Sequence, residues 1–298
     1  MDGIICINKP SGWTSFDVVA KIRGITRTRK IGHAGTLDPM ATGVLPLFFG
    51  TATKLCDILP NSEKGYLADF QLGCTTDTLD ITGTVLTEQE SHVSKNQVEA
   101  ALENFRGVIS QLPPMYSAVQ VNGRRLYDIA RAGQTVERAP RQVEIKKLDL
   151  LSFDELAQTG QFRVLCSKGT YIRSLCSDLG EALGCGAVLT ALVRECAGDF
   201  MLEDCLTLED VQTLMAQGDL EDKMLPLDRV FQGLKAIHLN EIQAKKFQNG
   251  VKLDLNRVHY RGQDESYRVY GPGDTFLGLA KLDLEKMELV IEKMLKRN

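Results

Sequence analysis

One carboxylate, Asp38, lies in a segment whose neighbouring residues constrain the backbone. The segment is GHAGTLDPMATGVLP, residues 32–46. Gly32 and Gly35 permit backbone angles that other residues avoid, and Pro39 disfavours helical geometry at the residue before it. The pattern predicts a carboxylate that a loop presents for chemistry. An ordinary turn is the alternative interpretation, because Asp-Pro often starts turns.

The elements around this loop are predicted from hydrophobic spacing. Residues 43–50 are apolar throughout and indicate a short buried strand, so Asp38 would lie where a loop enters a sheet. Residues 3–10 indicate another strand that ends in a turn. Ser15 is expected to cap a helix whose buried face carries apolar residues, namely Val18, Val19 and Ile22.

The middle of the chain mixes strands and helices. Strands are predicted at residues 66–72, 84–86, 162–166 and 187–194, and helices at 95–105 and 171–183. Thr207 and Asp210 form a capping-box pattern that starts a further helix. Because strands and helices interleave without strict βαβ alternation, we expect an α+β fold with a central mixed or antiparallel sheet.

An extended segment from residue 113, followed by a basic arm at residues 124–141, is predicted next. Pro113 and Pro114 exclude a helix there, residues 116–121 are expected to be extended, and Asn122-Gly123 indicates a tight turn. The arm that follows has few large apolar residues, so we expect it to depend on an external partner for order.

The domain boundary is expected within residues 224–231. The prediction is a larger domain at residues 1–228 and a small β-rich domain at 229–298, which carries a short helix near residues 242–247 and short strands after it.

Composition indicates a soluble globular protein. The chain has 298 residues, of which 43% are hydrophobic and 25% charged. No apolar stretch reaches membrane-spanning length, and the N-terminus lacks a signal-like pattern, so we expect a cytoplasmic protein without membrane contact. The eight cysteines are scattered without a C-x-x-C pair, which favours reduced, buried thiols.

Net charge alone argues against a nucleic-acid partner, but the distribution of charge argues for one. The formal charge is −4 and the pI is near 5.7. Residues 199–222 are acidic, whereas basic residues gather in two clusters: Lys21, Arg23, Arg27, Arg29 and Lys30, then Arg124, Arg125, Arg131, Arg138, Arg141, Lys146 and Lys147. Such segregation can steer a polyanion, although solvated helix faces are the alternative for either cluster alone.

Four separated motifs resemble one family. GHAGTLDPMATGVLP resembles the catalytic motif of pseudouridine synthases, and three others narrow this to the bacterial TruB family: NKPSGWTS (8–15), PPMYSAVQVNGRRLYDIARAG (113–133) and SKGTYIRSLCSDLG (167–180). The similarity covers about residues 3–200, and residues 276–280 resemble a PUA-type C-terminal domain. The resemblance implies the pseudouridine synthase fold, with residues 1–228 as the catalytic domain, an RNA-binding insertion at about residues 113–145, and a PUA-like domain at 229–298.

The same resemblance implies the reaction. TruB enzymes isomerise uridine to pseudouridine at position 55 in the T loop of tRNA, which requires the base to be flipped out. Asp38 would be the essential carboxylate, attacking either ribose C1′ or C6 of the base. Nothing is hydrolysed, so no second carboxylate is needed to activate water. We expect no cofactor and no metal.

Further site residues follow from the motif matches. Tyr66 matches the tyrosine that stacks on the flipped base, and Arg173 matches the arginine that pairs with the catalytic aspartate and keeps it ionised. Tyr171 and Leu192 match positions in the wall of the active site. His33 matches a histidine that contacts the target loop, and we do not expect it to be the general base.

Supporting and RNA-binding residues complete the predicted site. Lys9 and Pro10 resemble a pair that buttresses the catalytic loop, and Gly35 and Thr36 belong to that loop. Val193 stands where relatives usually have an arginine, which leaves one phosphate contact to its neighbour. The predicted RNA-binding residues are Arg23, Arg27, Arg29, Lys30, Arg124, Arg125, Arg131, Arg141 and Arg194.

The sequence also offers one possible metal motif and two alternative functions. Asp77 and Asp80 could suggest a metal pair, but a polar turn is the favoured interpretation. A non-catalytic protein that binds or folds RNA would use the same basic face. A guide-RNA-dependent synthase of the archaeal and eukaryotic kind is disfavoured by the self-contained insertion. We therefore expect a monomer that binds the T stem-loop of tRNA without a guide RNA.

Overall fold

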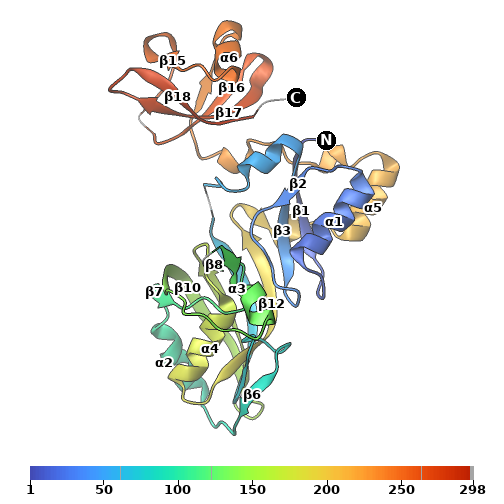
Figure 1. Cartoon of the computed structure of the whole chain (residues 1–298), viewed down its shortest axis with the longest axis vertical. Coiled ribbons are helices and arrows are strands. Elements are labelled where there is room, and N and C mark those ends of the chain that lie inside the picture. Colours follow the sequence, from blue (N-terminus) through green and yellow to red (C-terminus); the bar gives the residue numbers. More distant parts are fainter. Residues whose placement is uncertain (61, 122, 263, 296–298) are drawn as a thin grey trace.

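The computed structural model describes residues 1–60, 62–121, 123–262 and 264–295. A nine-stranded sheet forms the centre of the molecule, with the path β1-β3-β12-β4-β11-β10-β7 (Figure 1). On this path only β3 and β12 are parallel, so the sheet is mixed. The strands are β1 (Gly3–Lys9), β2 (Ile31–His33), β3 (Thr42–Phe49), β4 (Lys64–Leu72), β7 (Gly107–Gln111), β10 (Arg141–Asp154), β11 (Thr159–Cys166), β12 (Ala187–Ala197) and β13 (Phe200–Met201).

Four helices cover the sheet in two pairs. Helices α1 (Ser15–Thr26) and α5 (Leu208–Gln217) pack together against β1 and β3, and their shared core includes Val18, Ile22 and Val211. Helices α2 (Lys95–Glu103) and α4 (Ile172–Ala182) cover the other half of the sheet around a second core. The predicted α+β class with a central mixed sheet is confirmed.

Helix caps show how local sequence sets the boundaries. Thr207 and Asp210 form the predicted capping box of α5. The cap of α1 was expected at Ser15, but the N-cap is Thr14, which forms a capping box with Asp17. Ser15 is the first helical residue, and its buried hydroxyl therefore remains available for a contact elsewhere.

The glycines of the Asp38 segment have different roles, and the prediction was right for Gly35 and wrong for Gly32. Gly43 has φ = +102°, and a Cβ on it would lie 2.2 Å from the Arg194 carbonyl oxygen, so only glycine allows β3 and β12 to approach. Gly35 adopts the expected left-handed conformation, with φ = +82°. Gly32 does not, because it pairs as an ordinary residue of β2.

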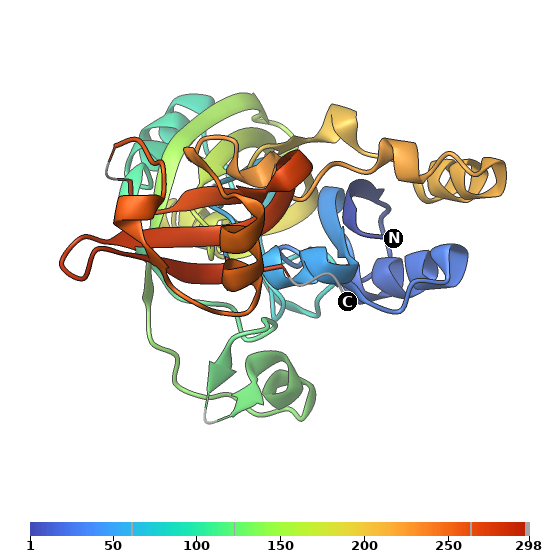
Figure 2. The same cartoon turned by 90° about the horizontal axis from the view of Figure 1, so that it is seen from above.

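The predicted insertion stands out from the body of the molecule (Figure 2). It forms a small hairpin of β8 (Gln120–Val121) and β9 (Arg124–Arg125), followed by α3 (Leu126–Arg131). The expected extended run is shorter than predicted, because the chain bends around residue 116. The predicted turn includes Asn122, which lies outside the described residues. Another small hairpin consists of β5 (Cys74–Thr76) and β6 (Val85–Glu88).

A β-rich region ends the chain, as predicted, and lies at the top of Figure 1. Its strands follow the order β14-β16-β17-β18-β15, and Phe231, Leu279 and Leu295 pack it against the region of β1 and β3 in a shared core. The exact boundary at residues 228 and 229 stays a prediction. The elements are β14 (Ala236–His238), α6 (Glu241–Gln248), β15 (Leu253–Asp254), β16 (Tyr267–Gly271), β17 (Thr275–Asp283) and β18 (Glu288–Met294).

The remaining structural features are the state of the cysteines, the character of the helices and the short 3-10 segments. All eight cysteines are free thiols. Within the part of the chain that the structure describes, no helix has the length and apolar character needed to cross a membrane. The 3-10 segments are η1 (Gly50–Leu55), η2 (Leu202–Asp204), η3 (Glu221–Lys223), η4 (Arg229–Phe231), η5 (Leu255–Arg257) and η6 (Pro272–Asp274).

Candidate active site

The Asp38 loop connects β2 to β3 and is fixed from the side of α1. The Ser15 hydroxyl accepts a hydrogen bond from the Leu37 amide at 2.9 Å and contacts the Leu37 carbonyl oxygen at 3.2 Å. On the other side of Asp38, the Lys9 ammonium donates to the Pro39 carbonyl at 3.2 Å. Both neighbours of the carboxylate are therefore tied to the fold, which limits how far Asp38 can move.

Lys9 lies beneath this loop as a completely buried residue. Its ammonium also donates to the carbonyl oxygens of Pro10 at 2.9 Å and Trp13 at 2.6 Å. Burial lowers the pKa of Lys9 to about 8, although the negative charge of Asp38 opposes the shift. These three carbonyl contacts support the buttressing role expected of Lys9 and Pro10.

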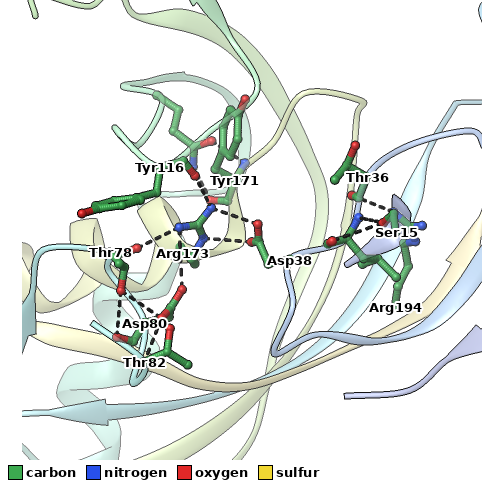
Figure 3. A network of polar contacts seen from close by, with 12 residues as sticks. Ser15, Thr36, Asp38, Thr78, Asp80, Thr82, Tyr116, Tyr171, Arg173 and Arg194 are labelled. Carbon is green, nitrogen blue, oxygen red and sulfur yellow. Dashed lines mark hydrogen bonds and ion pairs between the residues drawn. The ribbon is translucent and has the colours of Figure 1, made fainter. Parts of the chain in front are cut away.

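Arg194 is a correction to the predicted RNA contacts. Its side chain is completely buried, so it presents no guanidinium to a phosphate. Instead it donates to the carbonyl oxygens of Val44 at 2.7 Å, Gly35 at 3.0 Å and Thr36 at 3.4 Å. Arg194 therefore holds the first half of the Asp38 loop against β12 (Figure 3).

Asp38 and Arg173 form a two-pronged ion pair, with Arg173 projecting from the first turn of α4. Arg173 Nε lies 2.9 Å from Asp38 Oδ2, and Arg173 Nη2 donates to Asp38 Oδ1 at 3.1 Å (Figure 3). The guanidinium also donates to the carbonyl oxygens of Thr78 at 2.9 Å and Tyr116 at 2.8 Å. Arg173 is thus fixed from three segments and orients both carboxylate oxygens.

Opposing electrostatic effects act on the Asp38 carboxyl. Burial raises its pKa above the usual aspartate range, and the nearby Arg173 charge acts in the opposite direction. The negative charge of Asp80 adds to the upward shift. The carboxylate is consequently more basic than a solvated aspartate, and it remains about one-third exposed to the pocket.

The carboxylate faces an open cavity of about 230 Å³. Tyr66 from β4 and Leu192 from β12 line it together with Tyr171, the N-cap of α4. Burial raises the pKa of Tyr66 to about 12, so its phenol is neutral over the ordinary pH range. One pocket therefore brings together five predicted site residues: Asp38, Tyr66, Tyr171, Arg173 and Leu192, with Thr36 at its edge.

His33 lies outside the residues that line this pocket. It ends β2, and its buried Nδ1 has no hydrogen-bond partner within the described part of the chain. Burial lowers the pKa of His33, and the Arg194 charge acts in the same direction. The imidazole is therefore largely neutral at pH 7.

The other predicted RNA-binding residues form two groups, whose members are exposed except for Arg23. In the first, Arg23 is half-buried and donates to the Ile31 carbonyl at 2.9 Å. In the insertion, the Arg131 guanidinium lies 4.4 Å from the centre of the Tyr127 ring. The exposed members are Arg27, Arg29, Lys30, Arg124, Arg125, Arg131 and Arg141.

Sequence reasoning missed the position of Asp80. Its carboxylate lies 3.7 Å from Arg173, is buried, and accepts hydrogen bonds from Thr78 at 2.9 Å and Thr82 at 2.6 Å. The hydroxyl bonds agree with the predicted polar turn, but the contact with Arg173 was not foreseen. Among the described residues no group of three or more His, Cys, Asp or Glu side chains could hold a metal.

Comparisons with family profiles and with curated relatives agree on one family of proteins. Residues 23–172 match the family profile described as "TruB family pseudouridylate synthase (N terminal domain)", and residues 173–236 match "tRNA pseudouridylate synthase B C-terminal domain". A tRNA pseudouridine synthase B of Clostridium kluyveri is 42% identical over 94% of this chain and 95% of its own length. One of Clostridioides difficile is 41% identical, with 95% coverage of both chains.

Solved structures show a similar fold. The chain superposes on a Cbf5-Nop10-Gar1 complex with a TM-score of 0.75 and 26% identity, covering 99% of this chain and 85% of the other. An H/ACA RNP bound to a substrate RNA gives a TM-score of 0.73 at 24% identity, with the same coverages. The second likeness concerns the fold alone.

Proposed function

Because the chain belongs to the TruB family of pseudouridylate synthases, we propose that it isomerises uridine to pseudouridine at position 55 in the T loop of tRNA. One observation carries this assignment more than any other. The Asp38 carboxylate is held by Arg173 at 2.9 and 3.1 Å in a pocket that Tyr66 also lines. A single carboxylate beside an aromatic ring suits a reaction on one flipped nucleoside.

The chemistry requires the bond from ribose C1′ to uracil N1 to break and a bond from C1′ to C5 to form. The C5 proton is then lost, and N1 gains a proton. Asp38 attacks either C1′ or C6, while Arg173 orients its oxygens. Because the same uracil is reattached, no water needs activation. The buried loop contacts of Lys9, Ser15 and Arg194 keep Asp38 in place during these steps.

The free-energy cost of flipping the uridine out must be offset by favourable contacts between the protein and the RNA. Extruding the uridine costs about a few kcal/mol. Stacking on Tyr66 returns roughly 1–3 kcal/mol. Phosphate contacts from the exposed basic residues supply the remainder, which makes RNA binding sensitive to salt. His33, at the end of β2, is proposed to contact the target loop near the extruded base.

We propose further that the protein works alone, as a cytoplasmic monomer without guide RNA. The insertion carries its own exposed arginines on α3 and the β8–β9 hairpin, beside the segment of Tyr116 that contacts Arg173. A substrate-binding element is therefore built into the chain. The β-rich region at residues 229–298 would be a PUA-like domain that adds RNA contacts.

The test uses purified full-length protein and an unmodified tRNA transcript, with no other protein or RNA. We expect pseudouridine at position 55, detected by mass spectrometry of nuclease fragments. Modification at a different position would contradict the substrate assignment. Modification only after addition of a guide RNA would contradict the proposed independence, and binding without any pseudouridine would favour the non-catalytic RNA-binding alternative.

A further inference from the structure

Lys64 lines the same pocket as Asp38 but has no contact that explains its position. It precedes Tyr66 by two residues on β4, so both side chains lie on the same face of the strand. Within the described part of the chain its ammonium makes no hydrogen bond or ion pair. A half-buried ammonium without a partner loses part of its hydration, so such a group in a pocket is a candidate for a functional role.

The surroundings of Lys64 are positive. A Cβ placed on Gly35 would lie 2.7 Å from Lys64 Nζ and 3.5 Å from Arg194 Nη1, so the two cations share one small space. Burial lowers the pKa of Lys64 to about 8, and the Arg194 charge acts in the same direction. Arg194 donates to three carbonyl oxygens, whereas Lys64 donates to no group among the residues that the structure describes.

A second polar group in the pocket is also unpartnered. Ser117, which comes from the insertion, has a buried hydroxyl without a hydrogen-bond partner among the described residues, and it lines the same cavity. Lys64 from the sheet and Ser117 from the insertion are donors on different elements around one cavity. The pocket therefore suits a flat ligand with polar edges between apolar walls such as Tyr66 and Leu192.

We propose that the Lys64 ammonium donates a hydrogen bond to a carbonyl oxygen of the flipped uracil and stabilises the negative charge that develops on the ring. This inference rests on the proposed function. If Asp38 attacks C1′, the electron pair of the C1′–N1 bond moves into the ring and onto its carbonyl oxygens. If Asp38 attacks C6, the C5=C6 electron pair moves toward O4. Lys64 keeps its proton in both routes and strengthens its bond as charge accumulates.

A phosphate is the less suitable ligand for Lys64. The Lys64 side chain is half-buried and lines the pocket, whereas Arg124, Arg125 and Arg141 are exposed and accessible to an RNA backbone. Phosphates remain at the protein surface when a base is extruded into a pocket. The apolar walls around Lys64 thus favour contact with the base.

The experiment compares wild type with Lys64→Met and Lys64→Arg in single-turnover assays on a T-stem-loop RNA. Lys64→Met retains the length of the side chain and removes the charge. We expect its rate at saturating RNA to fall about 10²-fold, with RNA affinity changed less than about threefold. Lys64→Arg should recover part of the rate. Lys95→Met, which removes an exposed lysine of α2, is the charge-matched control and should react like wild type.

A second readout separates contact with the base from a merely structural role. RNA with 2-thiouridine or 4-thiouridine at the target offers a weaker acceptor at one carbonyl. For the carbonyl that Lys64 contacts, the effects of sulfur and of Lys64→Met should be non-additive. Additive effects at both positions would overturn the inference, provided that thermal unfolding shows both variants to be folded.

Three other outcomes test either the role of Lys64 or the proposed function. A Lys64→Met rate within threefold of wild type would refute the role of Lys64 while leaving the proposed function intact. Loss of RNA affinity with an unchanged saturating rate would identify Lys64 as a phosphate contact and also overturn the inference. Failure of the wild type to form pseudouridine in tRNA would instead refute the proposed function.

Discussion

The Asp38 loop and the insertion at residues 113–145 are built in opposite ways. The loop is held by Lys9, Ser15 and Arg194, all of them buried. The insertion has two-residue strands, one short helix and exposed arginines. The comparison indicates that chemistry is assigned to the preorganised region and RNA capture to the region with few internal contacts. Variants in the two regions should therefore fail in different ways.

The largest effect is expected from Arg173→Met. This change leaves the Asp38 and Asp80 carboxylates without their shared cation and removes donors to two carbonyl oxygens. The single-turnover rate should fall roughly 10³-fold. Arg173→Lys should not restore it, because an ammonium cannot hold two carboxylate oxygens and two carbonyls in the same plane. A rate within tenfold of wild type for either variant would argue against preorganisation.

Arg194→Met should loosen the loop without touching the substrate. Three carbonyl oxygens lose their buried donor, so the free energy of unfolding should fall by about 3 kcal/mol. Displacement of Asp38 should lower the rate by about 10²-fold in the fraction that remains folded. Denaturant unfolding and single-turnover assays at low temperature measure the two effects. An unchanged stability would show that these contacts are not structural.

Replacing Arg124 and Arg125 with alanine should give the reverse pattern. Both residues are exposed on β9, so loss of their charge should weaken RNA binding about tenfold and lower the salt dependence of binding. The rate at saturating RNA should stay at the wild-type value. Binding isotherms at several salt concentrations provide the measurement. A large loss of the rate at saturating RNA would contradict the proposal that the insertion binds RNA while the Asp38 loop carries the chemistry.

The smallest expected effect is a pH dependence of stability at Lys64. Its pKa is about 8 in the folded protein and 10.5 is the ordinary value, so between these pH values the unfolded chain binds more protons. Wild-type stability should rise over this window relative to Lys64→Met, by about 1 kcal/mol or more. Urea titrations from pH 7 to 10.5 measure the difference. If the difference in unfolding free energy between wild type and Lys64→Met did not change with pH, the Lys64 ammonium would be fully solvated in the folded protein.

Local patterns allowed much of the fold to be predicted. The Thr207–Asp210 capping box specified the start of α5, and the apolar run after Asp38 specified β3, because both signals lie within a few residues. The α1 cap was misassigned between Thr14 and Ser15. Adjacent hydroxyl residues compete there, and Asp17 stands at capping-box spacing from Thr14 alone.

The candidate site was only partly predictable because its remaining contacts depend on tertiary structure. Asp80 and Arg173 are far apart in sequence, and nothing in the local pattern indicates that they meet. Arginine side chains usually lie at the protein surface, so the sequence gives no sign that Arg194 is buried. The parallel pairing of β3 and β12 buries it. Lys64 could be found only once Gly35 and Tyr66 were placed beside it.

The most direct test compares wild type with Asp38→Asn on the same T-stem-loop RNA under single-turnover conditions. The substitution preserves shape but removes the carboxylate that Arg173 orients. We predict RNA affinity within about threefold of wild type and a rate of pseudouridine formation reduced by at least roughly 10⁴-fold. Pseudouridine formation by Asp38→Asn at a rate within tenfold of wild type would contradict the account.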